Sequence, residues 1–95
     1  MTQNNDGTVK PEQQDQILFM MLVQQHQQIA RMGLGEQENP TTGKKEKDLK
    51  AVKYAIDTLT MLEKFTAGNL TKEMSGYLTD TLRSLRLKYV DANKT

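Results

Sequence analysis

Residues 55–73 read AIDTLTMLEKFTAGNLTKE, and they decide the fold because they describe two helices joined by a tight turn. Gly68 stands where a helix C-terminus favours a left-handed residue, a conformation that glycine adopts without a Cβ clash. Thr71 offers a hydroxyl to an unpaired backbone N–H of the next helix, and Glu73 suits the positive end of that helix's dipole. The stretch therefore predicts a helical hairpin with Gly68 at positive φ, and it carries no catalytic motif.

Hydrophobic spacing predicts three helices in the chain. The first begins at about Pro11 or Glu12 and reaches Met32, while the others cover about 48–67 and 72–90, with apolar residues every three or four positions. No segment alternates with a period of two, so we expect no strand. We therefore predict an all-α protein in which the second and third helices form an antiparallel hairpin. The first helix packs across this hairpin, and the whole forms a dimeric bundle.

Composition divides the chain into one domain and three segments outside its helices. Residues 1–15 are almost entirely polar, which predicts a disordered N-terminal tail and leaves a three-helix domain at 16–90. The connector at 33–47 holds three glycines, Pro40 and several charges, and we expect it to be mobile. Residues 91–95 are expected to form a frayed C-terminus.

The first predicted helix contains an unusual apolar run, ILFMMLV at 17–23. Apolar side chains at every angle over two turns need cover on more than one side, whereas a surface helix shows a single stripe. Three arrangements provide such cover: a central place in a small core, burial between two protomers, or a groove for a partner helix formed by Phe19, Met20 and Met21. We favour burial in a homodimer. Because Met20 and Met21 point about 100° apart, at least one of them should face the partner.

Charge and residue types limit the partners of this chain. Thirteen basic and twelve acidic residues give a net charge of +1, so no strong field attracts nucleic acid or acidic membranes. Five lysines where the connector enters the second helix are interleaved with acidic residues and predict a solvated surface: Lys44, Lys45, Lys47, Lys50 and Lys53. The sequence has no cysteine and no signal-peptide order, and its longest apolar run is far below the roughly 20 residues of a membrane span. We expect a cytoplasmic protein that does not span a membrane.

No motif predicts catalysis, a cofactor or a metal site. His26 is the only histidine and stands among glutamines, which favours a structural or solvent-facing role over metal binding. The Gly33-x-Gly35 pair lacks the third glycine of a dinucleotide fingerprint, and Gly43-Lys44 lacks the spacing and the hydroxyl of a phosphate loop. We therefore expect no cofactor, no metal and no enzymatic activity.

Asp57 stands at the flank of the apolar stripe of the second helix and allows two interpretations. An exposed pair with Lys53, four residues earlier, would contribute a few tenths of a kcal/mol. We favour this pair. The alternative is a contact between helices, from Asp57 to Arg83 or Arg86, that would fix the packing register.

Several short motifs between Phe19 and Val90 match a known pattern. They are Leu22-Val23 with Gln25 and His26, Asn39-Pro40, Thr42-Gly43, Ile56-Asp57 with Leu59, Met61 and Leu62, Thr66, Gly68-Asn69-Leu70-Thr71, Leu85-Arg86 and Tyr89-Val90. Together they resemble a family of short bacterial proteins known as domain of unknown function 1844. The resemblance implies a bacterial, cytoplasmic helical protein and brings no activity with it. Phe65 stands where relatives often have a lysine, which enlarges the apolar surface at the hairpin tip, and Met74 replaces the acidic residue of a capping box.

The functional prediction is a non-enzymatic, self-associating helical interaction or adaptor module, with an unidentified protein partner beside its own copy. The alternative is a nucleic-acid-binding accessory protein, and a catalytic role ranks last. The candidate structural and interaction residues are Phe19, Met20, Met21, Asp57, Phe65, Gly68, Asn69, Thr71 and Arg86.

Overall fold

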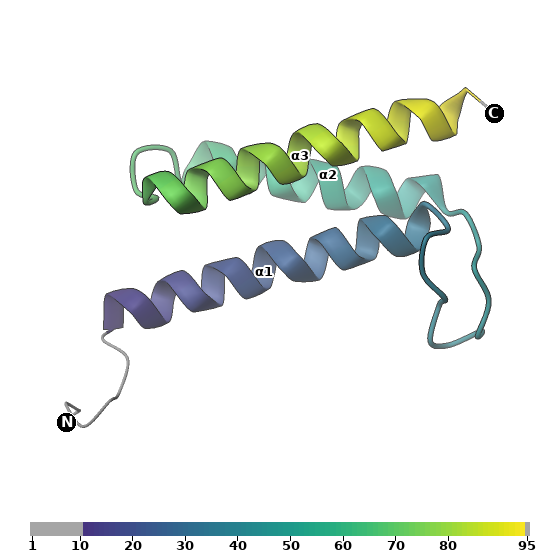
Figure 1. Cartoon of the computed structure of the whole chain (residues 1–95), viewed down its shortest axis with the longest axis horizontal. Coiled ribbons are helices and arrows are strands. Elements are labelled where there is room, and N and C mark those ends of the chain that lie inside the picture. The colour runs from purple at the N-terminus through teal and green to yellow at the C-terminus, as the bar shows by residue number, and fades with distance from the viewer. Residues whose placement is uncertain (1–10, 95) are drawn as a thin grey trace.

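A computed structural model describes residues 11–94 of the chain and contains three helices. They are α1 (Pro11–Gly33), α2 (Leu49–Phe65) and α3 (Lys72–Asn93). The helices lie side by side, with α2 running opposite to α1 and α3 (Figure 1). Between residues 11 and 94 there is no strand, only an isolated antiparallel bridge between Leu34 and Lys47. The prediction of an all-α fold with three helices is confirmed.

The hairpin between α2 and α3 has the predicted turn. Gly68 has a φ of 86°, in the left-handed region that favours glycine. The Thr71 hydroxyl accepts a hydrogen bond from the Met74 backbone N–H at 3.1 Å and so caps α3. At the other end of α2, the Asp48 carboxylate accepts one from the Ala51 N–H at 3.2 Å. The predicted N-cap at Thr71 is confirmed, and Asp48 caps α2 in the same way, because capping depends only on residues within one helical turn.

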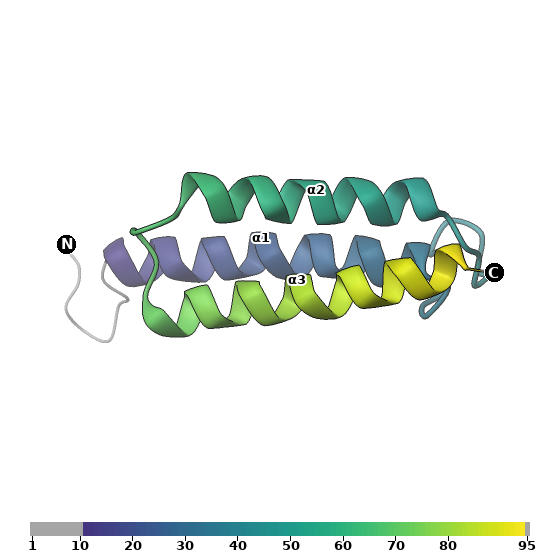
Figure 2. The same ribbon diagram turned by 90° about the horizontal axis from the view of Figure 1, so that it is seen from above.

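Helix α1 lies along the hairpin and, seen from above, between α2 and α3 (Figure 2). It packs more closely on α2 than on α3. Gly33 permits its close approach to α2, since a Cβ at this position would lie 2.7 Å from the Asp48 carbonyl oxygen and 2.8 Å from Val52 Cγ2. The Asp48 N–H donates a hydrogen bond to the Gly33 carbonyl at 2.7 Å. The end of α1 is therefore held against the start of α2.

Two predicted boundaries are wrong. Helix α1 begins at Pro11, as the hydrophobic spacing predicted, so the tail predicted for residues 1–15 is too long by residues 11–15, and residues 1–10 lie outside the described residues. Helix α3 continues through Asn93, so residues 91–93 are helical instead of frayed. Extending a packed helix forms one hydrogen bond for each residue that is ordered, which needs no apolar burial at the helix end.

The connector from 34 to 48 contains a hydrogen-bonded turn of its own. The backbone N–H of Asn39 donates to the Lys44 carbonyl at 2.8 Å, and the N–H of Gly43 donates back to the Asn39 carbonyl at 2.7 Å. Leu34, at the base of the connector, packs against the core. The predicted mobility of this segment stays a prediction, but its two ends are joined by the bridge between Leu34 and Lys47.

The core draws unequally on the three helices. The buried apolar side chains are Val23 and Ala30 of α1, Val52, Ala55, Ile56 and Leu59 of α2, and Met74, Leu78, Leu82 and Leu85 of α3. Helix α1 thus supplies the fewest buried apolar residues, although it contains the longest apolar run of the chain. Most of that run must therefore lie somewhere other than the core.

Candidate functional site

Much of the apolar run of α1 is exposed to solvent. Its exposed residues are Ile17 at 48%, Leu18 at 59%, Met21 at 57% and Leu22 at 37% of full accessibility. Val23 is fully buried and Phe19 packs partly against the core. The Cα trace measures only 16 Å along its shortest axis, so two helices cover one side of α1 and leave its outer side open. A central place for this helix in a monomeric core is therefore wrong.

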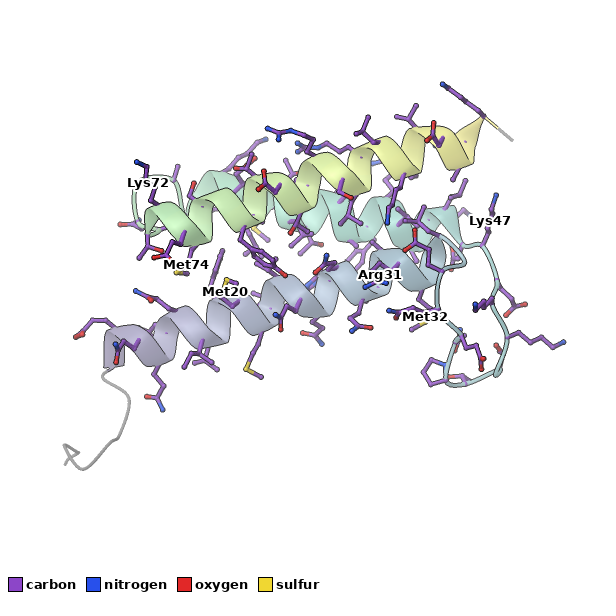
Figure 3. All side chains as sticks on the ribbon, in the orientation of Figure 1. Met20, Arg31, Met32, Lys47, Lys72 and Met74 are labelled. Atoms are coloured by element: carbon purple, nitrogen blue, oxygen red, sulfur yellow. The ribbon has the colours of Figure 1, made fainter. Side chains whose placement is uncertain are left out.

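The two adjacent methionines of α1 point to different surroundings. Met20 is half-buried and faces Met74 across the space between α1 and α3 (Figure 3). Together with Ile17 they line an open groove of about 540 Å³ near the start of both helices. Met74 is itself buried, so an acidic capping residue at this position would bury its carboxylate. Met21 points away from both helices and is the methionine available to a partner.

Helix α2 adds a second exposed apolar stripe. Tyr54, Met61 and Phe65 are exposed at 58%, 41% and 80%, and their spacing of seven and four residues places them on one side of the helix. The Tyr54 ring lies 5.8 Å, centroid to centroid, from the His26 ring of α1. The stripe of α2 therefore borders α1.

The two exposed stripes form one surface. Leu22 and Leu18 precede His26 by four and eight residues, so they lie along the side of α1 that borders α2. We call the combined surface the α1–α2 apolar face. It consists of Leu18, Met21, Leu22, Tyr54, Met61 and Phe65, while Ile17 belongs to the groove beside α3.

Helix α3 packs on the opposite side of α1 and α2. The Tyr77 hydroxyl donates to Gln27 Oε1 of α1 at 3.0 Å, and Arg86 Nη2 donates to the Thr60 hydroxyl of α2 at 2.9 Å. Gln27 and Thr60 lie on other sides of their helices than Leu18 and Tyr54 do. Helix α3 therefore does not cover the α1–α2 apolar face.

The outer side of α1 also has no charge. Residues 16–30 contain no Asp, Glu, Lys or Arg, and the exposed polar residues among them are glutamines: Gln24, Gln25 and Gln28. A solvated helix ordinarily carries charged residues opposite its core stripe. The cores of protein–protein interfaces, in contrast, are depleted of charge and enriched in aromatic residues and methionine. The α1–α2 apolar face has the composition of an interface.

His26 has a structural role in this arrangement. Its side chain is buried, its Nδ1 lies 3.0 Å from the Leu22 carbonyl oxygen, and its ring packs on Tyr54. Among residues 11–94, no three His, Asp or Glu side chains gather closely enough to hold a metal ion. Of the two predicted roles of His26, structural or solvent-facing, its burial and its contacts with a backbone carbonyl and a ring fit the structural one.

Asp57 forms the exposed pair that the sequence favoured. Lys53 Nζ lies 2.7 Å from Asp57 Oδ2, and this hydrogen bond raises the pKa of the Lys53 ammonium. The alternative contact from Asp57 to α3 is wrong. Arg83 pairs with Asp80 of its own helix, and Arg86 binds Thr60 instead of Asp57. Asp57 points to solvent beside Lys53, whereas Thr60, three residues later, faces α3.

The remaining candidates lie at the hairpin tip. Phe65 is the most exposed large apolar side chain, and it ends α2 directly before the turn. The Asn69 backbone N–H donates to the Thr66 carbonyl at 2.9 Å, inside the turn that Gly68 opens. Asn69 and Thr71 therefore act in the turn itself, and Phe65 belongs to the exposed face.

Sequence reasoning missed one residue that links distant parts of the chain. Glu36 of the connector lies 3.0 Å from Lys88 Nζ of α3 and 3.3 Å from Arg31 Nε of α1. The hydrogen bond from Lys88, helped by Arg31 and opposed by partial burial, holds the pKa of Glu36 below its usual value of 4.5. No local pattern pairs two residues that are 52 positions apart.

Comparison with known proteins identifies one family. The family described as Domain of unknown function (DUF1844) matches residues 16–91. No curated protein and no solved structure matches the chain. Within residues 11–94, no helix combines the length and the apolar character needed to cross a membrane.

Proposed function

We propose that this chain, which belongs to the DUF1844 family of domains of unknown function, is a non-enzymatic helical interaction module that forms homodimers in the cytoplasm. One observation carries the proposal, namely the uncharged α1–α2 apolar face on the side of the bundle that α3 leaves open. Such a face is unfavourable in water unless a partner covers it. The same property suits an adaptor, whose task is to bind another helical protein through a groove or a helix face.

The size of the face supports self-association. With about 200 Å² for each large side chain, its six residues expose on the order of 700 Å² at their observed exposed fractions. The largest apolar patch on a typical monomer is about 300–600 Å². Each partner of a standard interface buries about 800 Å². Pairing two copies of this face therefore supplies the area of a specific interface, and it encloses the apolar run of α1.

Sedimentation velocity at micromolar concentrations tests this proposal. We expect the wild-type chain to sediment as a dimer, and Met21→Glu to shift it toward monomer, because the substitution places two charges inside the interface. Leu87→Glu is the matched control, since Leu87 is 65% exposed on the outer side of α3. It should leave the dimer intact.

A wild-type chain that stays monomeric at high concentration would contradict the proposal. So would a Leu87→Glu variant that dissociates as readily as Met21→Glu does. If dimerisation and folding are coupled, Met21→Glu will instead unfold, and the wild-type melting temperature will rise with protein concentration. A melting temperature independent of concentration would then count against the dimer.

A further inference from the structure

We propose that two copies of the chain pack with α1 antiparallel to the partner's α1, about a twofold axis that passes between positions 19 and 20. This arrangement rests on the self-association proposed above, and it adds the orientation and register of the second copy. It closes the α1–α2 apolar faces of two protomers on each other. The result is a four-helix core in two facing layers, each an α1 and an α2 helix, with both α3 helices outside.

The outer side of α1 has the spacing of a helix-pairing seam. Its exposed residues fall at positions 14, 18, 21, 25 and 28, which are four and three residues apart in turn. This is the spacing of alternating positions in a heptad repeat, where helices meet along a continuous stripe. Leu18 and Met21 form the apolar centre of the stripe, and glutamines occupy its other positions.

Symmetry and the position of the apolar residues set the register. Symmetric dimers use the same patch on both subunits, so each apolar residue must meet an apolar residue of the copy. An antiparallel pairing centred between 19 and 20 places Leu18 opposite the partner's Met21, while Ile17 and Leu22 flank this pair on its two sides. The same register places Gln14 opposite the partner's Gln25, where two amides can exchange hydrogen bonds at the rim.

Helix α2 supports the same centre. The contact between His26 and Tyr54 fixes the antiparallel alignment of α1 and α2, so Met61 lies about level with Phe19. Met61 therefore lies beside the proposed axis, and Phe65 and Tyr54 lie on either side of it along the helix.

A parallel pairing fits the observations less well. It would bring Gln25 and Gln28 against their own copies, which buries amide groups and adds no apolar contact. It would also align the dipoles of the two α1 helices, which is unfavourable by a few tenths of a kcal/mol. The antiparallel pairing also brings Gln14 against the partner's Gln25, but it avoids the parallel alignment of the dipoles.

Single cysteines can test the register because the natural chain has none. Two cysteines form a disulfide only when their Cα atoms are within about 7 Å of each other. In the proposed register, Gln14 and the partner's Gln25 lie opposite each other, whereas two copies of Gln25 are about 16 Å apart along the helix axis. We expect a mixture of Gln14→Cys and Gln25→Cys chains to yield several times more covalent dimer, under mild oxidation, than either variant does separately.

Leu87→Cys mixed with Gln14→Cys is the matched control for random collision, since Leu87 lies outside the proposed interface. Gln25→Cys chains that couple to one another as well as the mixture does would overturn the antiparallel register and indicate the parallel one. A mixture that couples no better than the control would overturn it too, provided that sedimentation still shows a dimer. If the unmodified chain sediments as a monomer, the proposed self-association itself is contradicted. Failure of the register and failure of the proposed function are therefore distinguishable.

Discussion

Two glycines show how one residue type acts differently in two backbone conformations. Gly68 has a φ of 86° just after α2, whereas Gly76 lies inside α3 without a positive φ. A Cβ at either position would have open space around it. The effect of an added side chain on the free energy of unfolding therefore depends, at both positions, on the backbone conformation and not on packing.

Alanine at these two glycines should change stability in opposite directions. Gly68→Ala should lower the free energy of unfolding by about 1–2 kcal/mol, because a Cβ is strained in the left-handed region. Gly76→Ala should raise it by about 0.5–1 kcal/mol, because glycine is a poor helix former. Valine at position 68 should cost more than alanine there. Urea unfolding at one protein concentration measures both, and a Gly68→Ala variant as stable as the wild type would contradict the hairpin turn.

The connector is tied to two helices at Glu36. Its carboxylate lies between Lys88 of α3 and Arg31 of α1, and these cations lower its pKa. The folded state consequently binds a proton at Glu36 less readily than the unfolded state does. The resulting stabilisation is complete above the usual pKa of 4.5 and is lost as the pH falls through the lower, folded value.

Glu36→Gln should remove this pH-dependent part of the stability. At pH 7 the variant should be less stable than the wild type by less than about 1 kcal/mol, since the ion pairs are partly exposed. The difference should shrink as the pH falls below about 4.5. Thermal unfolding at a series of pH values measures it, with Glu38→Gln, an exposed glutamate of the same connector, as the control. A difference that grows toward acidic pH would show that the ion pairs do not act in this way.

At the scale of the whole molecule, charge balance sets what the surface attracts. The net charge is +1, and exposed cations such as Lys53, Arg83 and Lys88 lie within 4 Å of carboxylates. Nucleic-acid binding depends on cations that neutralise phosphates and release counterions. Cations that are already paired supply little of that attraction.

The protein should therefore bind duplex DNA weakly. We expect a Kd between about 10⁻⁶ and 10⁻⁴ M at physiological salt, the range of non-specific binding. Fluorescence anisotropy with labelled duplexes at several salt concentrations measures it. Sub-micromolar binding that weakens steeply with salt would favour the nucleic-acid accessory role over the interaction module.

The sequence determined the three helices of this protein and the turn between α2 and α3. The helical hairpin, Gly68 at positive φ and the caps at Asp48 and Thr71 all follow from residues within a turn of one another. The exposed pair of Lys53 with Asp57 follows in the same way, since both residues lie on one helix. Such features depend on local backbone geometry, which neighbouring residues set regardless of the rest of the fold.

Only the tertiary structure decided which surfaces meet. It shows that the apolar run of α1 is covered on one side, that Tyr54 and Phe65 extend its open side, and that Glu36 reaches Lys88. An apolar run in a sequence indicates that its side chains are to be buried, but it does not indicate which helix or partner buries them. That depends on how three helices of limited width are arranged around one another, and contacts between residues far apart in the chain exist only after the helices have packed.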